Sequence, residues 1–551
     1  MVLDAQPNYV RSPLSSPDDP LYASQWSLPQ AGFESAWDIE PGADGLCMAV
    51  LDTGIRSDHP DLIGRLSPGH DFVSDLWNSG DGNGIDSDPT DPFVSLGTHG
   101  THVTGILAAA SGNGIGVAGC TQAGLVMPVR VLGQQGGSDF DISQGILYAA
   151  GLPNASGLLP PQSAQVINMS LGGPNSSAIL WQAVRDAVAA GVVVVAAAGN
   201  FNSAQPMYPA AYPEVIAVAA TDAVDGRAYY SSYGDHVDLA APGGDQTADR
   251  NGDGVPDGVL STVIDLSLGA AYERKTGTSM AAPHVAGAAF LLRSLEPSLS
   301  VLEVAAYLKA GALDLGPAGW DREFGFGRLD AGRSLVLAAG LGSGPAEPAA
   351  TPISLEFSQN GEVHSFAVVN RGGTGPLAVL NVRSDAPWLT PLQTSGSTPC
   401  TLQARASTDG LPAGLHHTQL TLETAAGALV LPAVLSVDGG GSTGDGTVHV
   451  LAIDTLRGDV VLVLHLSEQS AGEFLLDPLA EGTYRIVGVT DLDGDGIGGE
   501  SDDYSGEVVN PHTGQTELLL RDGTALVGVP LVLETGRSHT LPGGGNIPLG
   551  P

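Results

Sequence analysis

Short apolar runs alternate with segments of helical periodicity between about residues 20 and 340, and this alternation constrains the fold most. Runs that are apolar at every position are typical of strands buried on both faces of a parallel sheet. The predicted strands are Leu46–Leu51, Leu125–Leu132, Val166–Met169, Val192–Ala198, Val215–Ala219 and Val237–Ala240. The predicted helices follow His99 and Ser279 and occupy Ile142–Ala150, Ala178–Ala190, Val301–Leu308 and Asp330–Ala339. The alternation predicts an α/β fold, a mostly parallel sheet with helices on both faces.

The helical signal ends at Gly342–Thr351, a Pro- and Ala-rich segment that predicts a linker. Period-2 runs follow, as in His364–Asn370 and Gln419–Thr424, and they fit an antiparallel sandwich. We expect a tail at residues 1–18, the α/β domain at 19–340, a linker at 341–352, a β-sandwich at 353–437, a linker at 438–446 and a β domain at 447–551. The two β modules are either separate small sandwiches or one larger one.

The charge balance excludes some classes of partner. The 551 residues include 21 Lys and Arg against 60 Asp and Glu, a formal net charge of −39. Such a surface repels phosphate backbones, so we expect no nucleic-acid partner. No apolar run reaches the roughly 18 residues of a membrane span. Much of the acid lies in Gly- and Asn-rich loops, which favours calcium binding, although a salt-adapted surface is an alternative and both can hold.

The three cysteines are too few for a disulfide framework. Cys47 and Cys120 fall in the same predicted domain, where they either pair or stay free and buried, whereas Cys400 falls in another domain. Cysteine usage therefore leaves the cellular compartment open.

Three local patterns in the α/β domain carry chemistry. Asp52 ends a predicted strand, His99 lies where a loop enters a helix, and Ser279 lies at a second such loop. Open α/β sheets gather reactive groups beyond the carboxyl ends of their strands. The order Asp, His, Ser along the chain is one of the known orders of a catalytic triad. Each fragment alone is common, but the three together predict nucleophilic catalysis.

The roles of the three residues follow from their chemistry. A serine hydroxyl is a weak nucleophile until an imidazole takes its proton, so His99 would be the general base and later the general acid. Asp52 would fix the imidazole tautomer and stabilise the imidazolium. Ser279 would lie at a helix N-terminus, where unpaired N–H groups favour a developing oxyanion.

The three candidate residues lie in the segments Ala49–Ile55, Gly97–Gly105 and Gly277–Gly287. Through these motifs the chain resembles the subtilases, the subtilisin-like serine peptidases, over roughly residues 18–339. The resemblance implies that Asn200 is an oxyanion-hole donor, with Gly199 beside it in the substrate-binding region. It also implies that an extended peptide pairs with the backbone of Ser170, Leu171 and Gly172. Met207 and Phe201 would stand near the first specificity pocket, for which we expect an apolar or aromatic side chain before the scissile bond. His102 and His284 are interpreted as structural.

The resemblance further implies a secreted, monomeric serine endopeptidase that acts on polypeptides through an acyl-enzyme. Asp4–Arg11 is similar to the end of an inhibitory propeptide, so we expect maturation by cleavage in or just after residues 9–18, with the chain's own propeptide as inhibitor. We expect that an upstream pro-domain and signal peptide are missing from this sequence. Two alternatives stay open: a calcium-binding surface or adhesion protein with a vestigial peptidase domain, and an intracellular processing protease.

Three acidic loops are candidate structural calcium sites, because Ca²⁺ prefers several hard oxygen ligands at near-alternate positions. The first resembles an acidic insert of some extracellular bacterial subtilases; the second copies half of an EF-hand loop but has Leu260 at the twelfth position. The third ends in an acid at that position. A solvated turn is the alternative. The candidate ligands are Asp81, Asn83, Asp86, Asp88 and Asp91; Asp249, Asn251, Asp253 and Asp257; and Asp491, Asp493, Asp495 and Asp502.

Overall fold

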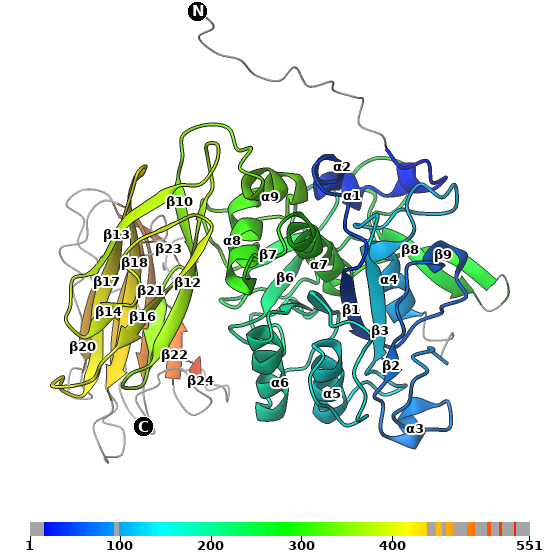
Figure 1. The fold of residues 1–551 in the computed structure, drawn as a ribbon, viewed down its shortest axis with the longest axis horizontal. Coiled ribbons are helices and arrows are strands. Elements are labelled where there is room, and N and C mark those ends of the chain that lie inside the picture. Colours follow the sequence, from blue (N-terminus) through cyan, green and yellow to red (C-terminus); the bar gives the residue numbers. More distant parts are fainter. Residues whose placement is uncertain are drawn as a thin grey trace, which may run out of the picture. The chain divides into compact units, whose positions relative to one another are not determined.

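The computed structural model describes residues 16–92, 98–265, 267 and 269–437, together with the backbone of six strands farther along the chain. The chain divides into two compact units, residues 1–342 and 343–551 (Figure 1). The expected tail lies almost wholly outside the described residues, and so does the third acidic loop with Asp491, Asp493, Asp495 and Asp502.

The first unit is built on a seven-stranded sheet in the order β2-β3-β1-β4-β5-β6-β7. Every neighbouring pair in this sheet is parallel, which confirms the predicted mostly parallel α/β fold. The strands are β1 (Cys47–Asp52), β2 (His70–Asp71), β3 (Leu125–Arg130), β4 (Val166–Met169), β5 (Val193–Ala197), β6 (Ile216–Thr221) and β7 (Leu239–Pro242). Only the short edge strand β2 was not predicted, because two residues carry no periodic signal.

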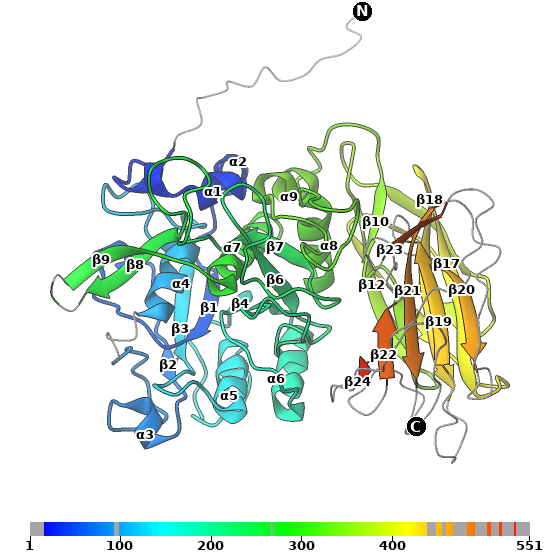
Figure 2. The same cartoon turned by 180° about the vertical axis from the view of Figure 1, so that it is seen from behind.

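Helices cover both faces of this sheet (Figures 1 and 2). Helices α5 and α6 pack on one face, and α4 and α7 pack on the other. The longer helices are α4 (His99–Ala108), α5 (Asp139–Ala149), α6 (Ala178–Ala189), α7 (Thr278–Leu295), α8 (Val301–Gly311) and α9 (Ala331–Ala338). The shorter ones are η1 (Tyr22–Ser24), α1 (Ser27–Gln30), α2 (Phe33–Trp37), η2 (Pro60–Leu62) and α3 (Leu76–Ser79).

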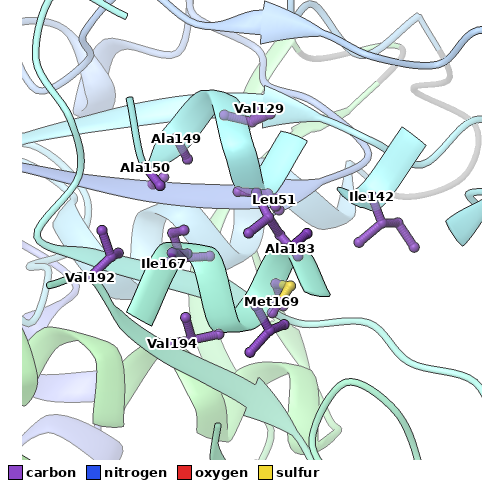
Figure 3. Close-up of a cluster of buried hydrophobic side chains, with 14 of the residues drawn as sticks. Leu51, Val129, Ile142, Ala149, Ala150, Ile167, Met169, Ala183, Val192 and Val194 are labelled. Atoms are coloured by element: carbon purple, nitrogen blue, oxygen red, sulfur yellow. The ribbon is translucent and has the colours of Figure 1, made fainter. Parts of the chain in front are cut away.

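A core of aliphatic side chains joins the central strands to α5 and α6 (Figure 3). Leu51 of β1 and Ile167 of β4 are fully buried there, and Ala183 of α6 packs against the same cluster. Small side chains on α6 bring the helix close to the β-branched residues of the sheet. Strands that are buried on both faces have apolar residues at every position, which explains the continuous apolar runs in the sequence. Close packing on both faces also holds the carboxyl ends of the strands rigidly at one edge of the sheet.

An antiparallel hairpin, β8 (Val259–Asp265) and β9 (Gly269–Lys275), precedes α7. The hydroxyls of Ser261 and Thr262 donate to the carbonyl oxygens of His102 and Thr101, each at 2.8 Å. The hairpin is therefore attached to the first turns of α4. This hairpin was not among the predicted elements.

The second unit begins with two sheets, of order β10-β12-β16-β14 and β11-β18-β17-β13-β15, which share one hydrophobic core. Phe366, Trp388 and Leu420 lie in that core, as expected of a β-sandwich. The strands are β10 (Pro348–Thr351), β11 (Leu355–Phe357), β12 (Val363–Asn370), β13 (Ala378–Ser384), β14 (Leu389–Pro391), β15 (Gly396–Ser397), β16 (Cys400–Ala406), β17 (Gly414–Thr424) and β18 (Gly427–Val437). Strand β10 lies in the second half of the expected linker 341–352, because its backbone pairs with β12.

A further sheet of order β20-β19-β21-β22-β24, with β23 on β21, occupies the β-rich C-terminal region. Its strands are β19 (Val448–Asp454), β20 (Asp459–Leu466), β21 (Gly482–Thr490), β22 (Tyr504–Glu507), β23 (Glu517–Leu520) and β24 (Glu534–Thr535). All its pairs are antiparallel, in agreement with the β domains expected after residue 340. Within the described part of the chain, no helix has the length and apolar character needed to cross a membrane.

Candidate active site

Asp52 and His99 form a hydrogen-bonded pair at the carboxyl edge of the sheet. Asp52 ends β1 and is 1% exposed, whereas His99 begins α4 and keeps 30% of its side-chain exposure. His99 Nδ1 lies 2.7 Å from Asp52 Oδ1. A carboxylate oxygen can only accept, so the proton is on Nδ1 and the second ring nitrogen, Nε2, is the basic one. This is the tautomer that a general base requires.

The close approach of α4 to β1 depends on the residue after His99. A Cβ atom at Gly100 would lie 2.2 Å from the carbonyl oxygen of Gly54 and 3.1 Å from Cβ of Asp52. The position therefore excludes every residue with a side chain. The hydroxyl of Thr53 accepts a hydrogen bond from the Gly100 amide at 3.1 Å, which fixes the same contact.

Two opposing effects set the pKa of His99. Burial disfavours the imidazolium, but the charge of Asp52 and its hydrogen bond outweigh burial, so the pKa of His99 lies above its ordinary value of 6.5. Lys275 opposes the imidazolium and Asp91 favours it, with smaller effects. The site thus stabilises the charged histidine that forms when a hydroxyl transfers its proton.

Ser279 is the second residue of α7, at the end of the loop that follows β9. Its amide lies among the first four of the helix, which have no intrahelical acceptor. Its hydroxyl donates to the carbonyl oxygen of Ser170 at 3.2 Å, just beyond β4. Since β4 and β1 are adjacent parallel strands, Ser279 reaches the same edge of the sheet as Asp52.

The orientation of the Asn200 amide is fixed by its neighbours. Asn200 Oδ1 accepts from the amide of Thr278 at 2.8 Å and from the Thr278 hydroxyl at 2.9 Å. That hydroxyl in turn accepts from the amide of Gly199 at 3.1 Å, so its own proton is free for Asn200. Both bonds require an acceptor on Asn200, and the Nδ2 amino group is therefore left as a donor in the loop next to Ser279.

The predicted substrate-binding segment leaves the sheet immediately after β4. Ser170 is buried, Leu171 is half-buried and Gly172 is exposed. The next residue, Gly173, exchanges two backbone hydrogen bonds with Tyr208, of 2.9 and 2.7 Å. The segment is thus held extended on one side, in a form to which a peptide strand can add. Met207 is buried beside Gly199, whereas Phe201 is 70% exposed.

His102 and His284 are fully buried, consistent with the structural role expected for them. His102 Nε2 lies 2.9 Å from the carbonyl oxygen of Glu273, and burial lowers the pKa of His102 to about 3. His284 Nδ1 lies 2.8 Å from the carbonyl oxygen of Met280, and burial lowers its pKa to about 4. Among the described residues Cys47, Cys120 and Cys400 form no disulfide, and the thiols of Cys47 and Cys120 are buried.

The first acidic loop does not gather its predicted ligands around one point. Asp81 pairs with the buried guanidinium of Arg130, which also contacts Asp71. The carboxylate of Asp91, only 2% exposed, accepts from the hydroxyl of Thr53 at 2.9 Å. The other predicted ligands bond within the loop, Asn83 to Asp86 and Asp88 to Thr90. A calcium ion at this loop stays a prediction.

The second acidic loop does bring its carboxylates together. Ligand atoms of Asp249, Asp253 and Asp257 lie within 4.8 Å of one another, the only such acidic group among the residues the structure describes. Asp257 is 1% exposed, and its Oδ1 atom has no hydrogen-bond partner in that part of the chain. Asn251 lies in the same turn, where its side chain accepts from the amide of Asp253 at 2.9 Å.

Two contributors to the site were missed in the sequence. Thr278 orients Asn200, and Thr53 links Asp91 to the start of α4. Each of these threonines is next to a predicted catalytic residue in the sequence. That position was the only sequence feature that could have indicated a role in the site. Nothing in their local sequence distinguishes them from ordinary loop threonines.

Comparison with known proteins places these motifs in context. A model described as "Subtilase family" matches residues 43–327. An "Extracellular protease" of Xanthomonas campestris pv. campestris is 39% identical over 307 residues, 51% of this chain and 50% of that protein. "Thermitase" of Thermoactinomyces vulgaris is 39% identical over 292 residues, 53% of this chain and 90% of that protein.

Among solved structures, a protease from Pseudoalteromonas arctica has a TM-score of 0.54 and 39% identity. The match covers 59% of this chain and 100% of the other. The chain thus spans the whole of that structure but only half the length of the Xanthomonas relative. The family model lies wholly within the α/β unit.

Proposed function

Because the chain belongs to the subtilase family of serine peptidases, we propose that it is a secreted endopeptidase that cleaves extended polypeptides through an acyl-enzyme on Ser279. The observation that carries the proposal is the pairing of Asp52 with His99 at 2.7 Å, at the sheet edge that Ser279 also reaches. Relatives that are named extracellular proteases support secretion.

In the first half of the reaction, the Ser279 hydroxyl turns from the Ser170 carbonyl toward His99. Nε2 of His99 takes its proton as Oγ attacks the scissile carbonyl carbon. The charge that develops on the carbonyl oxygen is stabilised by the Ser279 amide and Nδ2 of Asn200. His99 then gives its proton to the departing amine, and the C–N bond breaks.

In the second half, water replaces the amine. His99 takes a proton from the water as it attacks the acyl carbon, and the same donors stabilise the second oxyanion. The bond to Ser279 Oγ breaks, and Oγ recovers a proton from His99. Asp52 stabilises the imidazolium throughout, as the raised pKa of His99 requires.

The direct test is covalent labelling with a fluorophosphonate, which reacts with activated serines. We expect wild type to be labelled, Ser279→Ala to be unlabelled, and His99→Ala to react far more slowly. Ser298→Ala, which changes an exposed serine beyond α7, is the matched control and should label like wild type. Equal labelling of wild type and Ser279→Ala would reject the proposed nucleophile.

Cleavage of a peptide library would then define specificity. Met207 is buried beside Gly199 and Phe201 is exposed, and both are apolar residues that the resemblance implies near the first specificity pocket. We therefore propose an apolar or aromatic residue before the scissile bond. A library that shows charged residues at that position would contradict this preference.

A calcium ion at the loop of Asp249, Asp253 and Asp257 is part of the proposal. Three carboxylates together repel one another unless a cation neutralises them, and Ca²⁺ prefers such oxygen ligands. The twelfth position of this loop, where an EF-hand has an acidic ligand, is Leu260. The buried, unpartnered Oδ1 of Asp257 would replace that missing ligand. A bound ion would hold the loop closed through the backbone bridge between Asp245 and Asp257.

Trp26 offers a readout of this site that is independent of activity. Its indole Nε1 donates to the carbonyl oxygen of Gly258 at 3.2 Å, one residue beyond Asp257. Tb³⁺ in the loop should therefore luminesce when tryptophan is excited, and Ca²⁺ should quench the signal by competition. Asp253→Asn should weaken Tb³⁺ binding, whereas Asp186→Asn on the exposed face of α6 should not. Identical titrations for both variants would exclude the site.

We also propose that the protein matures by cleavage in or just after residues 9–18 and that the removed propeptide inhibits the enzyme. Only residues 16–18 of this region are described. N-terminal sequencing of active protein from its source tests the proposal, and a start at Met1 would exclude it. Sedimentation at working concentration tests the expected monomer.

A further inference from the structure

The carbonyl oxygen of Ser279 lies at a gap in the hydrogen bonds of α7. In a regular helix this oxygen would accept from the amide four residues later. That residue is Pro283, which has no amide hydrogen. A buried carbonyl without a donor is costly, so another group must satisfy it.

The hydroxyl of Ser170 replaces the missing donor. Ser170 Oγ donates to the Ser279 carbonyl oxygen at 2.8 Å. Nδ2 of Asn168 lies 3.0 Å from the same Oγ. An amide nitrogen can only donate, so Asn168 occupies a lone pair of the hydroxyl and leaves its proton for Ser279. The direction of the chain from Asn168 through Ser170 to Ser279 is thereby fixed.

Ser170 also contacts the reactive end of Ser279. The backbone carbonyl of Ser170 accepts from Ser279 Oγ at 3.2 Å. One residue therefore holds the nucleophile at its side chain and at its main chain. Ser170 is 4% exposed and Asn168 is fully buried in the central strand β4, so water does not compete for these bonds.

We propose that Ser170 is a positioning residue. Its hydroxyl fixes the first turn of α7, so that Ser279 Oγ stays within reach of His99 and the scissile carbon. Pro283 contributes by withholding the amide that would compete for the Ser279 carbonyl. This role is separate from the binding of substrate by the Ser170 backbone. The inference rests on the proposed function only in that Ser279 is the nucleophile.

The first test compares Ser170→Ala with wild type, using a fluorogenic peptide chosen from the library. The backbone that binds substrate is unchanged in this variant, so KM should stay within about twofold. Loss of the hydrogen bond and the looser nucleophile should lower kcat about 10-fold. Ser176→Ala, an exposed serine in the segment after β4, is the matched control and should keep both constants. A loss confined to KM, or an unchanged kcat, would overturn the proposal.

The second test is a double-mutant cycle with Pro283→Ala. Restoring the amide at position 283 provides a rival donor for the Ser279 carbonyl and should itself lower kcat by shifting the turn. Once Ser170→Ala has removed the first donor, the restored amide partly replaces it. The double variant should therefore lose less activity than the product of the two single losses. Strictly multiplicative losses would mean that the two residues do not share this carbonyl.

The same cycle measured by thermal unfolding separates this inference from the proposed function. The shared carbonyl predicts a coupling in Tm even if the protein hydrolyses no peptide. Absence of labelling in wild type together with coupled Tm values would reject the peptidase but keep the contact. Labelling together with independent Tm values and multiplicative kcat losses would reject the contact but keep the peptidase.

Discussion

The side-chain oxygen of Asn200 accepts two hydrogen bonds from Thr278, one from its amide at 2.8 Å and one from its hydroxyl at 2.9 Å. Thr278 directly precedes Ser279, so the proposed oxyanion donor and the proposed nucleophile are connected by one residue. Any movement of the first turn of α7 therefore moves the amide of Asn200 with it. Asn200 and Ser279 are thus held in place together.

Asn200→Ala should lower kcat by about 10²- to 10³-fold with little change in KM, the size known for loss of one oxyanion donor in subtilisin. Thr278→Val should lower kcat less, because the amide of Thr278 still holds Asn200 Oδ1. Steady-state kinetics on the library-derived peptide measure both. A larger loss for Thr278→Val than for Asn200→Ala would contradict this arrangement.

The pH dependence of kcat/KM should reflect the pKa of His99. Only the neutral imidazole accepts the proton of Ser279, so activity rises as pH rises through this pKa. Because Asp52 raises the pKa of His99, the pH at which kcat/KM reaches half of its maximum on the acid side should lie above 6.5. Asp52→Asn should lower both the midpoint and the rate, since the imidazolium loses its counter-charge. An acid limb that stays in place in Asp52→Asn would argue against the pairing.

Acid should destabilise the fold through buried histidines. His284 stays neutral in the folded protein, where its pKa is about 4, but it binds a proton in the unfolded chain below its ordinary value of 6.5. The unfolded state thus gains protons first, and the free energy of unfolding falls by up to about 1.4 kcal/mol per pH unit below that value. Urea unfolding between the two pH values measures the slope.

His284→Gln gives the matching variant, because glutamine can still donate to Met280 and accept from Ser27, its two neighbours. The slope of the free energy of unfolding against pH should then be smaller in the variant. The decrease corresponds to at most one proton bound by the unfolded chain. An unchanged slope would show that His284 already binds its proton in the folded protein.

Chelation should lower thermal stability. A cation that binds only the folded protein stabilises it by about 2.7 kcal/mol when present at 100 times its dissociation constant. Melts in EDTA and in excess Ca²⁺ should therefore differ, and Asp253→Asn should reduce the difference. Superimposable wild-type melts would exclude calcium at every predicted loop.

Much of the fold and of the site follows from local sequence. Continuous apolar runs predicted all the longer strands of the parallel sheet, because strands buried on both faces need apolar residues at each position. Asp52, His99 and Ser279 lie in short motifs at ends of these elements, and the motifs predicted where they would be placed. Their hydrogen-bond partners were not predictable in the same way.

The acidic loops illustrate the difference. Asp81 and Asp257 are each followed by a glycine in an acidic loop, and their positions in these loops made both candidate ligands. In the structure Asp81 pairs with Arg130, a residue far away in the chain, whereas Asp257 is buried with a free oxygen beside two other carboxylates. Whether a carboxylate meets an arginine or other carboxylates is decided by long-range packing.

The sequence by itself determined the α/β class, the family and the residues that we propose as the triad, since these depend on periodicity and on short motifs. Only the tertiary structure decided that Thr278 orients Asn200 and that Ser170 takes the place of the amide missing at Pro283. The physical reason is that a buried polar group must find a partner wherever one is brought close in space. The distance between two residues along the chain does not predict that partner. Ser170 and Ser279 are in contact because β4 ends beside the start of α7.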